Sequence, residues 1–188
     1  MLDNIKQVEV LKDIRSIRQY KDTKVDKKII ADIIDCARMA PTANNRQPWE
    51  FIVITDEDRL KDLSEIVPSG NFLKDVPVAI VVFCSKDTNY FLEDGSAATQ
   101  NILSAARFHG LGSCWIAGYQ GSYYENAEVP LCEGIPCYTP SSYGEEIRKI
   151  LDAPENLQLV SVVSLGYSDE KPNVDKRSLE EVLHWNKY

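Results

Sequence analysis

The chain has 188 residues, of which 44% are hydrophobic and 27% charged, values that fit one globular domain rather than a disordered or collagen-like chain. Its 29 acidic and 21 basic residues give a formal charge of −8, which argues against binding to nucleic acids. No run of residues is apolar enough to cross a membrane, and no signal-peptide pattern opens the chain. The five cysteines include no CxxC pair, which fits reduced thiols. We therefore expect a cytoplasmic protein.

The first 40 residues predict two helices separated by a basic turn. Apolar residues at helical spacing predict a helix at about residues 2–12, and the basic turn, residues 15–20, follows it. Asp26 is the expected N-cap of the second helix, because apolar residues from 29 to 37 recur on one face. This helix should end before Pro41, since a proline disfavours helical geometry at the preceding residue.

A polar loop, residues 40–49, then leads into two strands with a helix between them. The β-branched run of residues 50–55 predicts the first strand. The acidic residues 56–58 favour the positive end of the following helix, which should extend to Ile66, so we assign them a structural role rather than acid catalysis. Residues 78–83 are apolar without alternation, which predicts a central strand covered on both faces.

The second half of the chain is dominated by a helix at about Phe91–His109 that is rich in small residues and should be deeply buried. Gly110 should end this helix, and residues 113–117 predict a strand. The next segment, residues 119–143, is an irregular insertion with five tyrosines. After it we expect a helix at 145–151, a strand at 159–165 and a last helix capped by residues 178–181. We predict a single α+β domain over residues 1–188.

Two polar strings could bind a ligand, but neither is specific by itself. Arg15, Ser16 and Arg18 offer two guanidinium groups and a hydroxyl that suit a phosphate, although such arginines also form ordinary surface ion pairs. The amides of residues 40–49 suit the edge of a heterocycle, although they also fit an ordinary turn. The sequence contains no GxGxxG, GxxxxGK[ST], HExxH or GxSxG motif, and its two histidines exclude a multi-histidine metal site.

Taken together, five strings occur in an order and spacing that is typical of one family. They are residues 15–20, 40–49, 94–101, 110–116 and 165–167. With these strings the chain resembles the nitroreductase family of flavoproteins. The resemblance implies a three-layer sandwich, in which a central, mostly antiparallel sheet is flanked by helices, and an intertwined homodimer with one FMN at each end of the subunit interface.

The resemblance also implies a role for particular residues. Arg15, Ser16 and Arg18 would hold the FMN phosphate and ribityl chain, helped by Lys176 or Arg177. The residues that would lie along the isoalloxazine, several of them from the partner subunit, are Pro41, Thr42, Ala43, Asn45 and Gln47. The residues whose backbone would approach the reactive N5 edge of the ring are Trp115, Ile116, Ala117 and Gly118. No side chain needs to act as an acid or base, and no metal is expected.

The function that the resemblance implies is the reduction of a small electron-poor acceptor, such as a nitroaromatic or a quinone, by NADH or NADPH in a ping-pong scheme through FMN. Two alternatives stay open. One is a flavin-binding sensor or carrier with little turnover, and the other is a specialised relative that performs reductive dehalogenation or flavin fragmentation. Ile14 stands where many members carry an arginine, and Ala117 stands where larger members carry a glutamate near the flavin.

The remaining conspicuous residues have structural interpretations. We expect Trp49 and Trp115 to be packing residues. Three cysteines, Cys36, Cys84 and Cys114, are expected to be small core residues. A redox pair between Cys132 and Cys137 is disfavoured, because their spacing does not match a thiol-exchange motif. His109 and His184 should lie near helix ends without a catalytic role.

Overall fold

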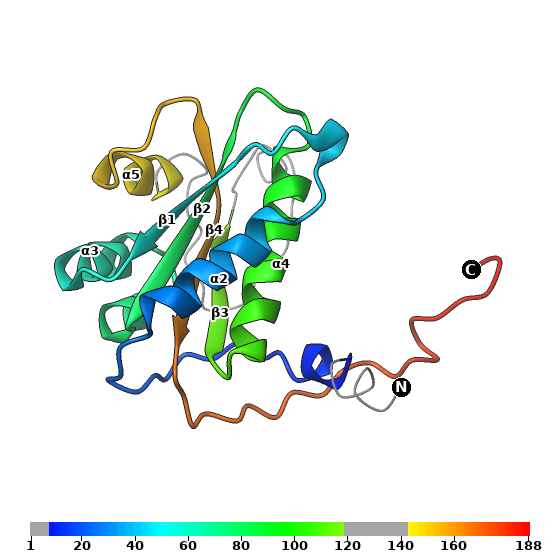
Figure 1. Cartoon of the computed structure of the whole chain (residues 1–188). Helices are drawn as coiled ribbons and strands as arrows, with labels where there is room; N and C mark the ends of the chain where they lie inside the picture. The colour runs from blue at the N-terminus through cyan, green and yellow to red at the C-terminus, as the bar shows by residue number, and fades with distance from the viewer. Residues whose placement is uncertain (1–7, 119–142) are drawn as a thin grey trace.

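The computed structural model describes residues 8–118 and 143–188, with the elements labelled in Figure 1. Residues 8–12 are helical. The helices that follow are α2 (Lys27–Arg38), α3 (Glu57–Ile66), α4 (Phe91–Phe108) and α5 (Tyr143–Ile150). The strands are β1 (Trp49–Ile54), β2 (Val78–Ser85), β3 (Gly112–Gly118) and β4 (Leu157–Gly166), and two short 3-10 turns are η1 (Ala43–Asn45) and η2 (Asn71–Asp75). No helix in these ranges is long and apolar enough to span a membrane.

The four strands form one sheet in the order β1-β2-β4-β3, and all three pairings are antiparallel. The predicted antiparallel sheet is therefore confirmed. β2 is an inner strand, and its residues 78–84 are all buried, which is what the unbroken apolar run predicts. A single parallel bridge between Ser16 and Ser113 adds the basic turn to the outer edge of β3.

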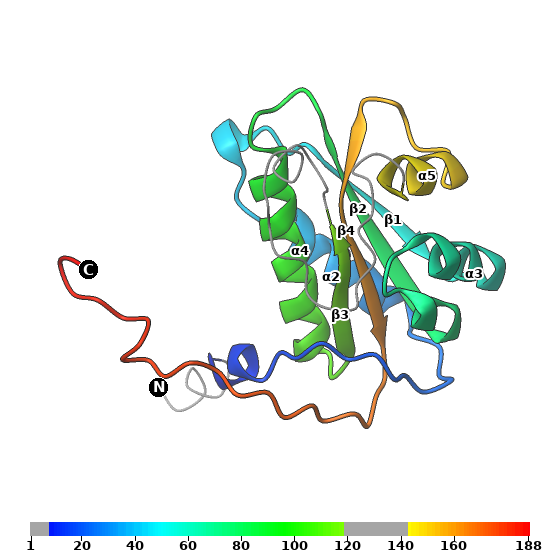
Figure 2. The ribbon, with the colours of Figure 1, turned by 180° about the vertical axis from the view of Figure 1, so that it is seen from behind.

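Helices cover both faces of this sheet, as Figures 1 and 2 show from opposite sides. The protein has two hydrophobic cores, one on each face of the sheet. Alternate residues of β2 pack into one core or the other, because successive side chains in a strand point to opposite faces. Ile80 and Val82 pack with α2 and α4, whereas Val81 and Phe83 pack with α3 and α5. The three-layer arrangement is therefore the predicted one.

The helix boundaries follow from local chemistry. The carboxylate of Asp26 accepts a hydrogen bond from the Lys28 N–H at 2.8 Å at the start of α2, and Asp56 accepts one from Arg59 N–H at 3.0 Å at the start of α3. Gly110 follows α4 with a φ of 73°, a left-handed geometry that glycine adopts without strain. The N-cap at Asp26 and the glycine after α4 were predicted, whereas residues 56–58 were predicted to begin α3 without a cap being assigned to Asp56.

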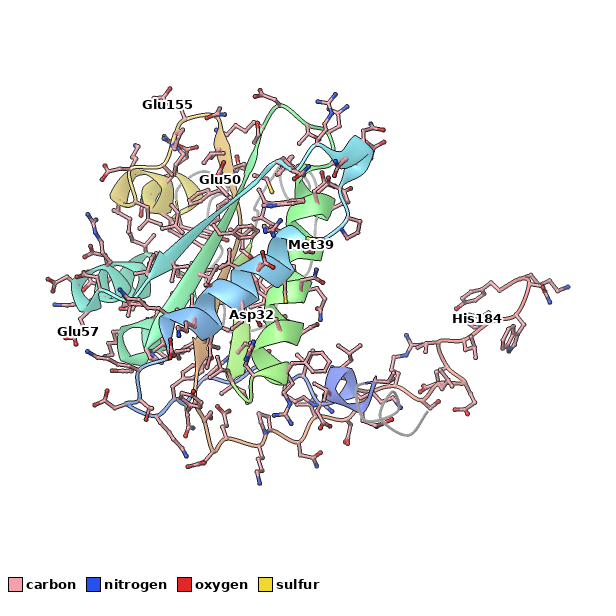
Figure 3. All side chains as sticks on the ribbon, viewed as in Figure 1. Asp32, Met39, Glu50, Glu57, Glu155 and His184 are labelled. Carbon is pink, nitrogen blue, oxygen red and sulfur yellow. The ribbon has the colours of Figure 1, made fainter. Side chains whose placement is uncertain are left out.

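The last helix was predicted wrongly. Residues 178–188 form turns, although Ser178 N–H donates to the Glu181 carboxylate at 2.7 Å as a capping box requires. The apolar side chains of Leu179 and Trp185 are 64% and 79% exposed, so the segment buries no apolar face, and short helices need such burial to be stable. In Figure 3 this tail, which carries His184, extends away from the rest of the chain, so His184 is not at a helix end.

Two further interpretations need correction. Cys36 is exposed, because it lies on the solvent side of α2, and Trp115 is 37% exposed, unlike the buried Trp49. Cys84 and Cys114 are buried as predicted, and burial raises the pKa of both thiols, to about 12 for Cys84. The proposed first residues of the amino-terminal helix, residues 119–142 of the insertion and the Cys132–Cys137 pair lie outside the described residues.

Candidate functional site

The predicted site residues gather at the two ends of α4. Arg15, Ser16 and Arg18 lie near its carboxyl end and the start of β3, whereas the loop of residues 41–47 lies at its amino end (Figure 1). We call the first cluster the basic cavity and the second the asparagine loop.

The basic cavity has a volume of about 340 Å³ and is lined by residues from four segments of the chain. Five of the predicted residues line it: Arg15, Ser16, Arg18, Trp115 and Lys176. Arg177 does not line it, and its guanidinium donates instead to the backbone carbonyl of Glu181 at 2.8 Å. The structure therefore places Lys176, rather than Arg177, beside the two arginines.

The basic turn is fixed against β3 by backbone and side-chain contacts. Ile17 N–H donates to the Ser113 carbonyl at 2.9 Å. This approach requires a glycine at position 112, since a Cβ there would lie 2.8 Å from the Ile17 side chain. The hydroxyl of Tyr20 donates to the Ile17 carbonyl at 2.6 Å, and burial raises the pKa of this phenol. Arg15 and Arg18 thus extend from a well-anchored backbone.

Glu170 also lines the basic cavity, and no motif in the sequence pointed to it. Its carboxylate accepts hydrogen bonds from the backbone N–H groups of Arg18 and Gln19 at 2.8 and 2.9 Å, which ties the carboxyl-terminal segment to the basic turn. With Arg15, Arg18 and Lys176 against one carboxylate, the cavity keeps an excess of positive charge. Such a set of donors suits a phosphate dianion.

The guanidinium groups of Arg15 and Arg18 are held by backbone carbonyls. Arg15 donates to the carbonyls of Lys12 and Ile14 at 2.6 and 2.9 Å, and Arg18 lies 3.5 Å from the Ser16 carbonyl. Within residues 8–118 and 143–188, neither arginine forms an ion pair with a carboxylate. Both charges therefore remain available to an anionic ligand.

β3 runs from the basic cavity along the edge of the sheet. Its register with β4 shifts at Ile116, and such bulges re-aim neighbouring residues and are frequent beside functional sites. At its end, Gly118 N–H donates to the Tyr143 hydroxyl at 3.2 Å, and this hydroxyl donates to the Gly118 carbonyl. The predicted residues 115–118 are therefore contiguous with the cavity, on a strand that is fixed at both ends.

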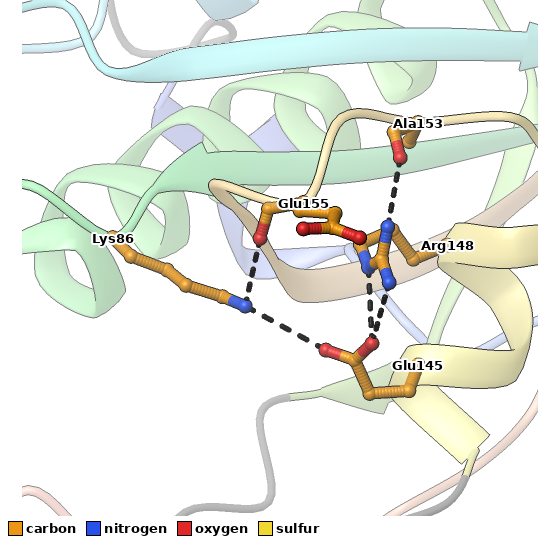
Figure 4. A network of polar contacts seen from close by, with 5 residues as sticks. All are labelled: Lys86, Glu145, Arg148, Ala153 and Glu155. Carbon is orange, nitrogen blue, oxygen red and sulfur yellow. Dashed lines mark hydrogen bonds and ion pairs between the residues drawn. The ribbon is translucent and has the colours of Figure 1, made fainter.

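Tyr143 begins α5, and a polar network fixes this helix to the rest of the chain (Figure 4). The Glu145 carboxylate accepts from the Arg148 guanidinium at 2.8 Å and pairs with the Lys86 ammonium at 3.6 Å. Arg148 also donates to the Ala153 carbonyl and Lys86 to the Glu155 carbonyl. The hydrogen bond from Arg148 lowers the pKa of Glu145.

The asparagine loop is built from unusual backbone geometry. Asn44, Asn45 and Gln47 have φ values of 53°, 55° and 50°, in the left-handed region that L residues other than asparagine and aspartate rarely adopt. Gln47 N–H donates to the Thr42 hydroxyl at 3.2 Å, and Ala43 N–H donates to the carboxylate of Asp94 at 3.0 Å. The loop is thus closed on itself and attached to α4.

The two clusters lie at different places along α4. Asp94, which holds the loop, and Leu103, which lines the basic cavity, are nine residues apart, which is about 14 Å along the helix at 1.5 Å per residue. No residue of the loop lines the basic cavity. The structure therefore brings together the predicted phosphate-binding residues and β3, but it does not bring the predicted residues of the loop to them. Those residues are Pro41, Thr42, Ala43, Asn45 and Gln47. In the described part of the chain, no cluster of three histidine, cysteine or acidic side chains could hold a metal.

A comparison with protein-family models matches the nitroreductase family to residues 11–75 and 68–167, which is most of the chain. The chain belongs to the nitroreductase family. A nitroreductase-family relative from Methanothermobacter thermautotrophicus, provisionally named NADH dehydrogenase/NAD(P)H nitroreductase, is 34% identical over 185 residues, covering 96% of this chain and 87% of the relative. The structure of an FMN-dependent nitroreductase from Clostridium difficile R20291 is 32% identical, with a TM-score of 0.80 over 96% of this chain and 99% of that one.

More distant relatives carry a different name. The iodotyrosine deiodinase of Thermotoga neapolitana is 25% identical over 206 residues, which covers 96% of this chain and 97% of the relative. The chain is thus similar in sequence both to proteins named nitroreductases and to proteins named iodotyrosine deiodinases.

Proposed function

We propose that this chain is an FMN-dependent oxidoreductase that reduces a small electron-poor acceptor, such as a nitroaromatic or a quinone, at the expense of NADH or NADPH. The observation that carries the proposal is the basic cavity beside the edge strand β3, in a chain that belongs to the nitroreductase family. The relative from Clostridium difficile, which is named an FMN-dependent nitroreductase, supports the choice of cofactor.

The residues present fit the cofactor. Arg15, Arg18 and Lys176 supply positive charge for a phosphate, and Ser16 supplies a hydroxyl for the phosphate or the ribityl chain. β3 leads from this cavity past Trp115 to Gly118, and its outer edge offers backbone groups to a flat ring. The positive charges thus lie at one end of β3 and the exposed strand edge continues away from them, which suits FMN because its phosphate and its ring are at opposite ends of the molecule.

The chemistry that FMN supplies when bound is the transfer of a hydride from the nicotinamide to the acceptor. The contribution of the chain is to bind and orient. The two arginines fix the phosphate end, and the anchored ends of β3 keep the backbone at 115–118 in place. Cys114 is a buried residue of this strand, and burial raises the pKa of its thiol, which keeps the thiol neutral, so it adds no charge to the site.

We also propose that the functional unit is a homodimer in which the asparagine loop of one copy meets the basic cavity of the other. This is supported by the lining of the basic cavity, which includes no residue of the asparagine loop of the same chain, although both clusters are expected to contact FMN. The exposed apolar residues of the tail, among them Val182 and Trp185, supply a surface that a second copy would bury.

A first experiment tests the cofactor and the donor. The purified protein is examined for flavin absorbance, and NADH or NADPH is added without oxygen while the visible band is followed. We expect the band to bleach and to return when a quinone or a nitroaromatic is added. Protein that is colourless and cannot be reconstituted with FMN would overturn the proposal, and a bound flavin that neither nicotinamide reduces would favour a flavin-binding sensor or carrier.

A second candidate function is reductive dehalogenation, which the similarity to the iodotyrosine deiodinase of Thermotoga neapolitana favours. The dithionite-reduced protein can be mixed with iodotyrosine or with a nitroaromatic, and the reoxidation rates compared. Faster reoxidation by the nitroaromatic supports the first proposal, and faster reoxidation by iodotyrosine supports the second. Sedimentation of the flavin-loaded protein tests the dimer, and a loaded monomer would contradict it.

A further inference from the structure

The asparagine loop holds three left-handed non-glycine residues within four positions, the densest such group among the described residues. Asparagine adopts this geometry more readily than other L residues, so the strain lies mainly at Gln47. Backbone strain persists only where the surroundings enforce it, and it gathers at ligand-binding and catalytic sites. Within the loop, two side-chain contacts help: Thr42 accepts from Gln47 N–H, and the Gln47 side-chain amide donates to the Asn45 carbonyl. A contact from outside the loop is therefore needed to attach it to the rigid part of the fold.

That contact comes from Asp94, in the first turns of α4. Only 4% of this residue is exposed, and its Oδ1 atom accepts from Ala43 N–H at 3.0 Å. Its Oδ2 atom has no hydrogen-bond partner among the described residues. A carboxylate that is buried with a single partner is costly to the fold. The hydrogen bond that partly offsets the cost of burying this carboxylate is the one from Ala43 N–H, in the asparagine loop.

The position of Asp94 is itself rigid. A Cβ at the adjacent Gly95 would lie 2.7 Å from the Val160 side chain, so this part of α4 is packed directly on β4. One turn further along, the Thr99 hydroxyl donates to the Gly95 carbonyl and pairs with the Ser161 hydroxyl at 2.7 Å. Asp94 is thus a fixed acceptor to which a strained loop is attached.

We infer that Asp94 is a positioning residue for the flavin site, which holds the asparagine loop in the conformation that contacts FMN. The inference rests on the proposed function, because it takes the loop to contact FMN bound in the basic cavity of a second copy. Asp94 does not touch the cofactor in this scheme. α4 connects the two clusters, since Leu103 of the same helix lines the basic cavity and Asp94 holds the loop.

The first test measures FMN binding to flavin-free protein by the quenching of flavin fluorescence. Asp94→Ala should weaken binding by about tenfold to a hundredfold, the range expected for loss of a hydrogen bond to a charged group. Asp94→Asn retains an acceptor oxygen and should change the dissociation constant by less than about threefold. Equal affinity of wild type and Asp94→Ala would overturn the inference.

Thr99→Val is the matched control on the same helix, since it removes a buried hydrogen-bonding group that does not contact the loop. It should lower the melting temperature and leave the affinity for FMN unchanged. If Thr99→Val weakens FMN binding as much as Asp94→Ala does, the effect of Asp94 reflects general stability, and the inference is wrong.

The second test needs no flavin. Arg46 is exposed within the loop, so trypsin can cleave after it, and mass spectrometry can follow the fragments 1–46 and 47–188. In flavin-free protein, Asp94→Ala should raise the cleavage rate at this bond at least tenfold over wild type and Thr99→Val, whereas Asp94→Asn should remain near wild type. Unchanged cleavage in Asp94→Ala would overturn the role of Asp94 and leave the proposed function standing. Wild-type protein that binds no FMN would overturn the proposed function.

Discussion

The two ends of α4 prepare a binding site in different ways. At the carboxyl end, the basic cavity gathers charged side chains from distant segments around a regular backbone, with Arg15, Arg18 and Lys176 as its cations. At the amino end, the asparagine loop is defined by left-handed backbone torsions rather than by charged side chains, and the buried carboxylate of Asp94 holds it in place. The comparison teaches that charge can be recognised from residue type, whereas a strained conformation cannot.

The largest effect is expected at the basic cavity. Arg18→Ala should weaken FMN binding by about tenfold to a hundredfold, because a hydrogen bond to a charged group contributes about 1.5–3 kcal/mol. Arg59→Ala is the control, since Arg59 is exposed on α3 and belongs to neither cluster. Fluorescence titration of the flavin-free variants measures both. If the two substitutions have the same effect, specific charge recognition at this end is refuted.

A smaller effect is expected at the asparagine loop, where the stability of the fold and the affinity for FMN should change in opposite directions. Gln47→Gly should leave the free energy of unfolding unchanged or raise it by up to about 1.5 kcal/mol, since left-handed geometry costs L residues about 1–2 kcal/mol and ordering a glycine costs about 0.5–1 kcal/mol. The same variant should weaken FMN binding by about threefold to tenfold through loss of the side-chain amide. Urea denaturation and fluorescence titration measure the two quantities.

The control for this variant is Ser69→Gly, because Ser69 has a φ of 60° but lies in a turn after α3, away from both clusters. It should stabilise the fold to a similar degree and leave FMN binding unchanged. A loss of stability in Gln47→Gly, with a gain in Ser69→Gly, would show that the loop is not strained and would remove the contrast between the two ends of α4.

The smallest effect is expected in the network around α5, which belongs to neither end. The pKa of Glu145 lies below its ordinary value of 4.5, because Arg148 donates to its carboxylate, so the pair stabilises the fold above that pH and is lost as the pH falls through the lowered pKa. Near neutral pH, Glu145→Gln should reduce the free energy of unfolding by less than about 1 kcal/mol, since both Lys86 and Glu145 are substantially exposed.

At a pH below the lowered pKa of Glu145, the difference in the free energy of unfolding between Glu145→Gln and wild type should vanish. Glu50→Gln, at an exposed position of β1, should behave like wild type at both pH values. Urea denaturation at the two pH values is the measurement. A deficit of Glu145→Gln that persists at low pH would mean that packing, rather than the ion pair, sets its effect. FMN binding should not change in either variant.

The regular elements could be predicted from the sequence because each has a local cause. Asp26 and Asp56 cap their helices, Gly110 ends α4 and the unbroken apolar run of residues 78–83 becomes an inner strand. The cluster of Arg15 and Arg18 could be proposed for the same reason, since residue type alone suggests an anion. The resemblance to the family supplied the other site residues, including the expectation that Lys176 or Arg177 would join the two arginines.

The parts that escaped prediction depend on contacts between distant residues. Glu170 is one of many surface-type carboxylates in the sequence, and only the fold brings it to the N–H groups of Arg18 and Gln19. Asp94 appeared as part of a family string, but its burial and its bond to Ala43 arise from the packing of α4. Leu179 suggested a helix through its local pattern, and this prediction failed because no surface among the described residues covers its side chain.

The bridge between Ser16 and Ser113 has a consequence for solubility. β3 is the outer strand of the sheet, and an uncovered outer strand can recruit strands from other molecules. The basic turn occupies the first part of that edge through the bond from Ile17 to Ser113. The segment that carries Arg15 and Arg18 therefore also shields the sheet from aggregation. Removing it would expose the edge strand to unrelated chains as well as abolish the anion-binding charges.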